Sequence, residues 1–181
     1  MSEHQLITAC KQGKLWARKT VYEQYAPTMM ALCCRYVSDY DDAQDVLQEG
    51  FLTVFTQIGQ YSGKGPFGAW IRKIFVNTAL EFIRKRKRLK EKEVRLDYIE
   101  DQPAKQSVLD DISADELMQC IAELPDTYRM VFNLFAIEGY KHQEIAGMLG
   151  IPESTSRSHF FRARQLLQQK ITTFTQKKDA I

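Results

Sequence analysis

The sequence has few cysteines and histidines, and none of them is spaced as metal ligands are. Its four cysteines, Cys10, Cys33, Cys34 and Cys120, form no C-x-x-C pair. Cys33 and Cys34 are adjacent and therefore point to different sides of a helix, and the three histidines are scattered along the chain. We therefore expect no metal site, and we interpret the cysteines as buried thiols in a reducing cytoplasm.

Long apolar runs and enzyme motifs are also missing. No apolar stretch reaches the length of a membrane span, and the first residues lack a signal-peptide core, so we expect a cytoplasmic protein without membrane insertion. The sequence contains no glycine-rich phosphate loop between a strand and a helix, no metal cluster and no nucleophile paired with a base. These absences predict a protein that is not an enzyme and uses no cofactor.

What the sequence does have is segregated charge. The 181 residues carry a formal net charge of only +2, which by itself says little. Basic residues are concentrated between Arg72 and Arg95, whereas acidic residues dominate between Asp97 and Glu116. This asymmetry suggests a basic surface for a polyanion joined to an acidic connector, although two solvated surfaces would show the same pattern.

Helical periodicity runs through most of the chain, and we find no convincing hairpin and no internal repeat. The first long helix has an apolar stripe of Leu15, Val21, Tyr22, Tyr25, Met29, Leu32 and Tyr36. Periodicity fades between Asp97 and Asp111. The predicted fold class is all-α, with two small helical domains at residues 1–92 and 113–175 and a flexible linker at 93–112. Further helices are expected at 42–58, from Pro66 or Gly68 into the basic block, and at 113–124, 125–138, 142–149 and 152–174.

The C-terminal part has the pattern of a helix-turn-helix. A short helix with Ile145, Ala146 and Leu149 inward ends at Gly150, which suits a φ > 0 turn. The next helix should bury Ser156, Phe160, Ala163 and Leu167. Long cations and short polar groups near its start suit phosphates and base edges in a major groove, although an ordinary helical hairpin is the alternative. The candidate DNA contacts are Glu153, Ser154, Thr155, Arg157, Ser158, His159, Arg162 and Arg164.

The long helix that ends in the basic block has two different faces. Its core stripe should be Ile71, Ile74, Phe75, Ala79, Phe82 and Ile83, and its exposed ridge Trp70, Lys73, Asn77, Glu81, Arg84 and Arg88, with Lys85 beside it. Cations can hold phosphates while amide and aromatic groups meet bases. The preceding loop, Gly59 to Gly68, adds Tyr61, Lys64 and Phe67, whose aromatic rings could stack an unpaired base. A solvated amphipathic helix after a mobile loop with two anchoring aromatics is the alternative.

The helix expected at 42–58 has an acidic, partly apolar outer face formed by Asp45, Gln48, Glu49 and Leu52, with Ala43, Leu47, Val54 and Ile58 inward. Such a face would repel DNA and suits a protein partner with basic residues. A plain solvated face is the alternative.

Three segments in this order, "DDAQDVLQEGFLTVF", "FGAWIRKIFVNTALEFIRKRKR" and "LPDTYRMVFNLFAIEGYKHQEIAGMLGIPESTSRSHFFRARQLL", resemble a bacterial sigma factor of the extracytoplasmic-function (ECF) type. The first is similar to region 2.2, the second to regions 2.3 and 2.4, and the third to region 4. The resemblance implies an alternative sigma factor that binds core RNA polymerase, at the clamp coiled coil of its largest subunit and at its flap region. It also implies promoter DNA and an anti-sigma factor as partners.

The resemblance assigns roles to residues of this sequence. It places Asp42, Asp45, Gln48, Glu49, Leu52 and Phe55 in the polymerase-docking segment. Tyr61 to Phe67 falls in a loop that captures a flipped −10 base, Trp70, Lys73, Asn77 and Arg84 fall on the −10 helix, and Arg157, Ser158, Arg162 and Arg164 fall on the −35 helix.

The sequence also departs from the family pattern at three positions. Ser156 replaces an aliphatic residue and should loosen helix packing slightly, His159 stands where Arg or Lys is common, and Glu81 where Asp is frequent. His159 puts one phosphate contact in doubt at neutral pH. The alternative function is a stand-alone helix-turn-helix transcriptional regulator that binds duplex DNA without polymerase.

Overall fold

The structure, a computed structural model, describes residues 2–93 and 113–178. Apart from its first residue, the linker expected at 93–112 lies outside these described residues, as does most of the acidic segment between Asp97 and Glu116. The described part of the chain is helical and contains no strand, as predicted. It forms two compact units, one within Met1–Arg86 and one within Lys87–Ile181.

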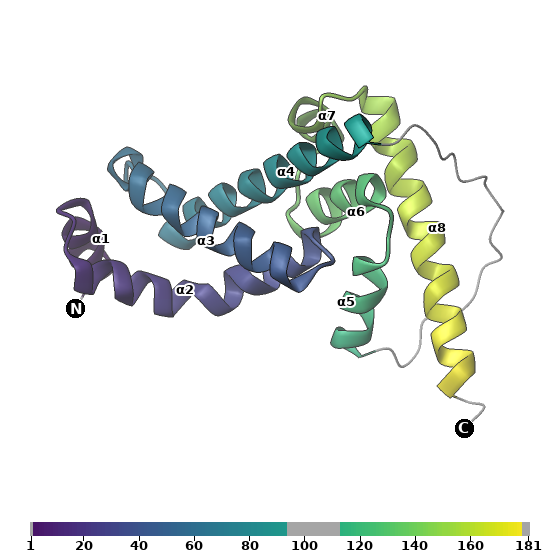
Figure 1. The fold of residues 1–181 in the computed structure, drawn as a ribbon, viewed down its shortest axis with the longest axis horizontal. Helices are drawn as coiled ribbons and strands as arrows, with labels where there is room; N and C mark the ends of the chain where they lie inside the picture. The colour runs from purple at the N-terminus through teal and green to yellow at the C-terminus, as the bar shows by residue number, and fades with distance from the viewer. Residues whose placement is uncertain (1, 94–112, 179–181) are drawn as a thin grey trace. The chain divides into compact units, whose positions relative to one another are not determined.

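Helices of the first unit follow one another with short connections (Figure 1). They are α1 (Glu3–Lys11), α2 (Leu15–Tyr36), α3 (Tyr40–Gln57), the short 3-10 helix η1 (Ile58–Gln60) and most of α4 (Phe67–Glu93). The second unit contains α5 (Ala114–Ala122), α6 (Asp126–Phe132), the π-helical turn η2 (Asn133–Ile137), α7 (His142–Leu149) and α8 (Glu153–Lys178). The expected helices are therefore all present, and α1 is an additional one.

Side-chain caps define where helices begin. Ser2 forms a capping box with Gln5 at the start of α1, and the Asp39 carboxylate accepts from the Asp42 amide at 3.0 Å at the start of α3. Ser113 and Glu116 form the capping box expected at the start of α5. Each cap satisfies backbone N–H groups that have no partner within their own helix.

The apolar stripe predicted for α2 is only partly correct. Met29, Leu32 and Tyr36 are fully buried in the core, but the side chains of Leu15 and Tyr22 are 80% and 43% exposed. Tyr22 still meets Phe51 of α3, with ring centroids 4.7 Å apart, but part of its side chain faces solvent. Leu15 is the first residue of α2 and lies at the edge of the unit.

Helices α3 and α4 approach each other closely at one glycine. A Cβ atom at Gly50 would lie 2.4 Å from the Phe75 ring, so only glycine leaves room for this aromatic side chain. The ring of Phe75 also meets Phe51 edge-on, with centroids 5.1 Å apart. This contact sets the spacing between the α3 face and the α4 ridge.

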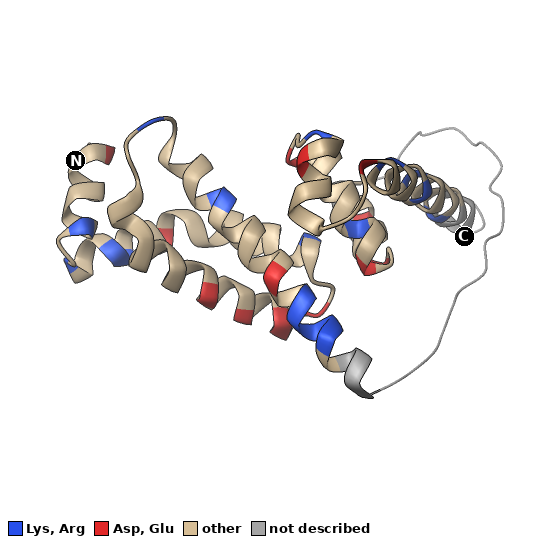
Figure 2. Ribbon diagram, turned by 90° about the horizontal axis from the view of Figure 1, so that it is seen from above, with Lys and Arg blue, Asp and Glu red and all other residues tan. Residues whose placement is uncertain are grey.

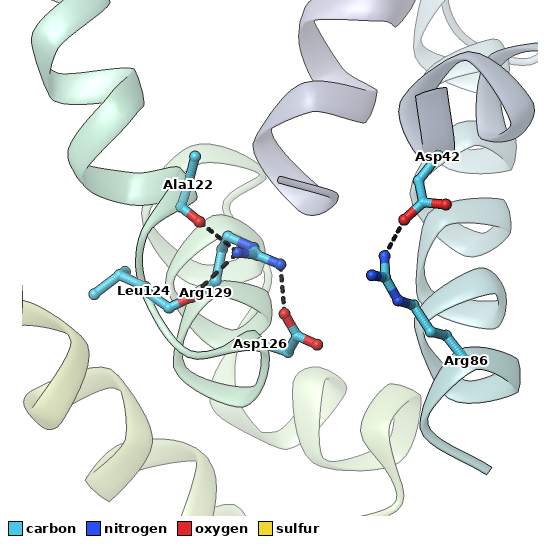
Figure 3. A network of polar contacts seen from close by, with 6 residues as sticks. All are labelled: Asp42, Arg86, Ala122, Leu124, Asp126 and Arg129. Atoms are coloured by element: carbon cyan, nitrogen blue, oxygen red, sulfur yellow. Dashed lines mark hydrogen bonds and ion pairs between the residues drawn. The ribbon is translucent and has the colours of Figure 1, made fainter. Parts of the chain in front are cut away.

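The second unit is held by an apolar cluster and a buried arginine. Cys120, Ile121 and Leu124 pack with residues of α8, namely Ala163, Leu167 and Ile171. Arg129 is buried, and its guanidinium donates to the Ala122 and Leu124 carbonyls at 2.6 and 3.1 Å and to the Asp126 carboxylate at 2.5 Å (Figure 3). Because these acceptors offset the cost of burying the Arg129 guanidinium, its hydrogen bonds stabilise the connection between α5 and α6.

The predicted turn between α7 and α8 is confirmed. Gly150 ends α7 in the left-handed region with φ 67°, and the Ile151 amide donates to the Ala146 carbonyl at 3.1 Å. This bond satisfies a carbonyl at the end of α7 and turns the chain into α8. Helices α7 and α8 therefore form a helix-turn-helix.

The cysteines are free thiols, and Cys10, Cys33 and Cys120 are buried. Burial, with a smaller contribution from Cys34, raises the pKa of Cys33 to about 12, so this thiol stays protonated at neutral pH. Within residues 2–93 and 113–178, no cluster of His, Cys, Asp and Glu could hold a metal ion. None of the helices described is long and apolar enough to cross a membrane.

Candidate nucleic-acid interface

The two faces predicted for α4 are confirmed. Lys73, Asn77, Glu81, Arg84 and Arg88 are exposed and Trp70 is half-buried, so the ridge faces solvent. The opposite stripe is buried in the core except for the half-buried Phe82. Because burial of the apolar stripe fixes the rotation of the helix, it also fixes the direction in which the ridge points.

Basic residues gather at the C-terminal end of the described α4 side chains (Figure 2). Not all of them face outward for a ligand. Arg86 pairs with Asp42 of α3 (Figure 3), and the Lys85 ammonium lies 3.1 Å from the Glu81 carboxylate one turn earlier. Arg88 is exposed at the end of the ridge. The positive charge of the basic block is thus partly neutralised by Asp42 of α3 and Glu81 of α4.

The pairing with Arg86 changes the interpretation of Asp42. This carboxylate was a candidate for polymerase docking, but it is half-buried and holds the start of α3 against α4. It can contact a protein partner only by sharing or releasing Arg86. Local spacing did not reveal this, because the two residues are 44 positions apart in the sequence.

The loop before α4 is anchored by its aromatic residues. Phe67 is completely buried and Tyr61 is only 8% exposed, and their ring centroids lie 5.1 Å apart. The Trp70 ring contacts both, at 5.5 Å from Tyr61 and 5.7 Å from Phe67. A base therefore cannot stack directly on Phe67 in this conformation. Tyr61 and Phe67 instead anchor the loop, which was the alternative interpretation of these aromatic residues. Lys64 is exposed at its tip.

The outer face of α3 is acidic and partly apolar, as predicted. Asp45, Gln48 and Glu49 are exposed, and Leu52 is 62% exposed. Acidic residues recur along this part of the chain (Figure 2). Phe55 is half-buried beneath the Arg18 guanidinium, which lies 5.7 Å from its ring centroid. A groove of about 470 Å³ separates this face from the α4 ridge, and its lining includes Asp45, Glu49, Asn77 and Glu81.

The outer side of α8 carries most of the predicted duplex contacts. Glu153, Ser154, Arg157, Ser158 and Arg164 are exposed, whereas Thr155 and Arg162 are half-buried. Glu153 accepts from the Arg157 guanidinium at 2.6 Å, and the Ser158 hydroxyl donates to the Thr155 carbonyl at 2.9 Å. Glu153 therefore orients Arg157 in the free protein as well as being a candidate acceptor for a base.

His159 does not lie where a phosphate contact is expected. Its ring is half-buried and meets Tyr128 of α6 edge-on, with centroids 5.3 Å apart. Burial lowers the pKa of His159, so the side chain is neutral at pH 7. We conclude that His159 packs α8 against α6 instead of contributing a cation.

Two structurally important residues were missed by sequence reasoning. The His142 Nδ1 atom lies 2.9 Å from the Ser156 hydroxyl oxygen in the helix-turn-helix core, and Lys11 donates to the Tyr61 carbonyl at 2.8 Å. No motif signals either contact. Only the polar Ser156 at a core position of α8 was a hint that a polar partner lies opposite.

Both units are similar to known protein families. The family model described as Sigma-70 region 2 matches residues 21–89, and that described as Sigma-70, region 4 matches residues 114–167. The RNA polymerase sigma-H factor of Pseudomonas aeruginosa is 28% identical over 181 residues, covering 93% of this chain and 93% of its own. The ECF RNA polymerase sigma-E factor of Haemophilus influenzae is 27% identical over 185 residues, covering 94% of this chain and 96% of its own.

One solved structure supports the fold. It contains the sigma factor RpoE in complex with the anti-sigma factor NepR from Bartonella quintana. It is similar with a TM-score of 0.54 at 22% identity, over 85% of this chain and 96% of the other.

Proposed function

Because the chain belongs to the sigma-70 family, as a sigma factor of the ECF type, we propose how its two units share the work of transcription initiation. The chain is an alternative sigma factor that directs RNA polymerase to promoters. The observation that carries this assignment is that each family region falls on one compact unit with an exposed candidate contact surface, apart from the last three residues of the region 2 match. We assign docking and the −10 element to residues 1–92, and the −35 element to residues 113–175.

In this proposal the first unit docks on core polymerase through α3. Asp45, Gln48, Glu49 and Leu52 offer carboxylates around an exposed leucine, which complements a basic and partly apolar partner. The clamp coiled coil of the largest polymerase subunit is the proposed partner, and the flap region is the proposed contact of the second unit. Asp42 acts indirectly, by holding α3 on α4 through Arg86.

The same unit would open and read the −10 element with α4 and the loop before it. Asn77 presents an amide at the groove, and Trp70, Lys73 and Lys64 lie along the ridge and loop. Capture of an unpaired base here offsets unstacking, which costs about a few kcal/mol. Tyr61 and Phe67 shape the loop from inside, and Arg84, Lys85 and Arg88 hold phosphates beside it.

The second unit would read the −35 element as duplex. Helix α8 would enter the major groove with its first turns, where Glu153, Ser154 and Arg157 lie. Ser158, Arg162 and Arg164 would contact phosphates and base edges farther along. His159 is left out of this contact set because it packs against Tyr128.

The cellular location of the protein and its regulatory partner are part of the same proposal. The protein would act in the cytoplasm and contribute binding energy only, with polymerase supplying the chemistry. An anti-sigma factor is a proposed partner, since the similar RpoE was solved in complex with one. A stand-alone helix-turn-helix regulator is less well supported, because residues 21–89 would then have no role.

Transcription in vitro tests the proposal. Core polymerase is supplied with fragments of the source genome, with and without the protein, and transcript starts are mapped. We expect promoter-specific transcripts only when the protein is present, and weak promoter binding by the protein alone. Strong specific duplex binding without polymerase, together with no new transcripts from any fragment, would support the stand-alone regulator instead.

A further inference from the structure

Helix α1 lies outside the segment that matches region 2, yet it contacts the loop between η1 and α4. Lys11 is the last residue of α1, and its ammonium donates to the Tyr61 carbonyl oxygen at 2.8 Å. Four apolar side chains of α1 are buried: Leu6, Ile7, Ala9 and Cys10. Because these side chains fix α1 on the unit, the Lys11 contact ties the start of the loop to a rigid element.

The end of the loop is in contact with Tyr25 of α2, which interacts with Glu3 of α1. Burial raises the pKa of Tyr25, and a hydrogen bond and charge from Glu3 in the first turn of α1 raise it further. The Tyr25 ring meets Phe67 edge-on at 5.9 Å. Its Cε1 atom would lie 3.1 Å from a Cβ at Gly68, so the backbone approaches the ring closely there. The start of the loop is thus in contact with α1 through Lys11, and its end is in contact with Tyr25 of α2.

The aromatic residues anchor the two ends of the loop, but its tip has few contacts of its own. Gly63 and Gly65 have φ of 78° and 89°, and no atom lies within 4 Å of a Cβ built on either. Glycines at such positions lose more conformational entropy on ordering than other residues do. Within the loop, the Tyr61 hydroxyl donates to the Gly65 carbonyl at 2.6 Å, and the Lys64 amide donates to the Ser62 hydroxyl at the longer distance of 3.4 Å. The bond from Tyr61 restrains the loop only if Tyr61 is itself held.

We propose that α1 is a positioning element for this loop and that Lys11 is its positioning residue. By fixing the Tyr61 backbone, Lys11 keeps the Tyr61 hydroxyl on Gly65 and holds the loop tip in one conformation before DNA arrives. A preorganised loop loses less entropy when it captures a base. The capture of a DNA base by the loop rests on the proposed function. The ordering of the loop by α1 does not depend on that function.

A simple electrostatic role for Lys11 is the competing explanation, since any lysine near DNA attracts phosphates. Lys19 provides the matched control. It is an exposed lysine of the same unit, and its ammonium lies 3.7 Å from the Glu23 carboxylate on the same helix. Lys11→Met and Lys19→Met therefore remove the same charge, but only the first removes the bond to Tyr61. Lys11→Arg keeps a donor of similar reach.

Amide exchange and NMR relaxation in the free protein test the ordering directly. In Lys11→Met, the Tyr61 amide, which donates to the Ile58 carbonyl at 3.2 Å, should exchange about fivefold faster, because opening of this junction no longer breaks the net hydrogen bond of about 1 kcal/mol from Lys11 to the Tyr61 carbonyl. The order parameters of the Gly63 and Gly65 amides should fall from near ~0.85 toward ~0.6. Lys19→Met should resemble the wild type, and Lys11→Arg should lie between. Unchanged exchange and order parameters in Lys11→Met would overturn the proposal.

Transcription with holoenzyme tests the consequence. Two templates are compared, a fully paired promoter found by the genome-fragment assay and the same promoter with a mismatched, already open −10 segment. Lys11→Met should lower transcription severalfold on the paired template and much less on the open one. An equal loss on both templates, or an equal loss in Lys19→Met, contradicts a positioning role in opening. If the wild type gives no promoter-specific transcript, the proposed function fails, and the exchange experiment still decides whether α1 orders the loop.

Discussion

The Nδ1 atom of His142 lies 2.9 Å from the Ser156 hydroxyl oxygen, and this contact joins α7 to α8 inside the helix-turn-helix. Ser156 is fully buried and His142 is nearly so, with its ring stacked on Phe135 at 4.3 Å. A serine at this core position departs from the aliphatic residue usual in the family. It was expected to loosen packing, but the structure gives it a polar partner instead.

The first prediction concerns this pair. Ser156→Ala leaves a buried imidazole nitrogen without its partner and should destabilise the second unit by about 1–3 kcal/mol. The double variant H142F/S156A removes both polar groups and keeps an aromatic ring on Phe135, so its loss should be smaller than the sum of the two single losses. Urea unfolding followed through the Ala163 and Leu167 amide signals measures this. Ser154→Ala, at an exposed serine of α8, is the control and should change stability little.

The second prediction is that the second unit loses stability in mild acid. Burial lowers the pKa of His142, the nearby Arg157 charge lowers it further, and Glu153 opposes them, while burial lowers the pKa of His159. Because the fold lowers the pKa of both histidines, their contribution is complete above the unfolded pKa of about 6.5 and is lost progressively as the pH falls from that value through the lower folded-state pKa values.

Urea unfolding of the full chain at several pH values between 5 and 8 measures this loss. The loss should be reduced in H142F/S156A, which keeps only His159 of the pair. A second unit equally stable at pH 5.5 and 7.5 in the wild type would contradict the prediction.

The third prediction uses the close approach of Gly50 to Phe75. Gly50→Ala places a methyl group 2.4 Å from the ring, so the ring or α3 must shift. Overpacking costs about 1–3 kcal/mol, which should outweigh the gain of up to ~1 kcal/mol in helix propensity. Both tryptophans, Trp16 and Trp70, lie in the first unit, so their fluorescence in urea reports its stability.

A matched glycine gives the opposite expectation. Gly147 lies in α7, and a Cβ there would meet nothing within 4 Å. Gly147→Ala should therefore leave the second unit as stable as the wild type or stabilise it by up to ~1 kcal/mol. Equal behaviour of the two variants would show that the α3–α4 contact is less tight than described.

The fourth prediction tests the docking face. Changing Asp45 and Glu49 together to Lys should weaken binding to core polymerase about tenfold or more, because like charges would then face a basic partner. Fluorescence titration with core enzyme measures the affinity, and urea unfolding checks the fold. Glu23→Lys, at an exposed residue of α2, controls for net charge. Unchanged affinity in the double variant would remove the assignment of this face.

The fifth prediction separates phosphate contacts from base recognition on α4. Arg88→Gln should weaken promoter binding by holoenzyme uniformly across −10 sequences and reduce the slope of log affinity against log salt by about 1. Asn77→Ala should leave the salt slope unchanged and relax discrimination at one −10 position. A sequence-dependent effect of Arg88→Gln, or a uniform effect of Asn77→Ala, would reverse the two roles.

Local patterns in the sequence determined the helices other than α1 and most of their faces. Apolar spacing along residues 142–149 predicted α7 with the bounds it has, Gly150 predicted the turn, and Ser113 with Glu116 predicted the cap of α5. The ridge of α4 followed from the same reasoning. These features depend on neighbours within one or two helical turns, so a single sequence contains the information that defines them.

Only the tertiary structure decided which side chains on those faces are available. Asp42 is paired with Arg86, Phe67 is buried, His159 packs on Tyr128, and Lys11 holds Tyr61 from 50 positions away. Each of these contacts joins segments that are distant in the sequence or turned toward another helix. Helical periodicity places a residue on a face, but packing between helices decides what that residue meets there, and therefore whether it is left to bind DNA or polymerase.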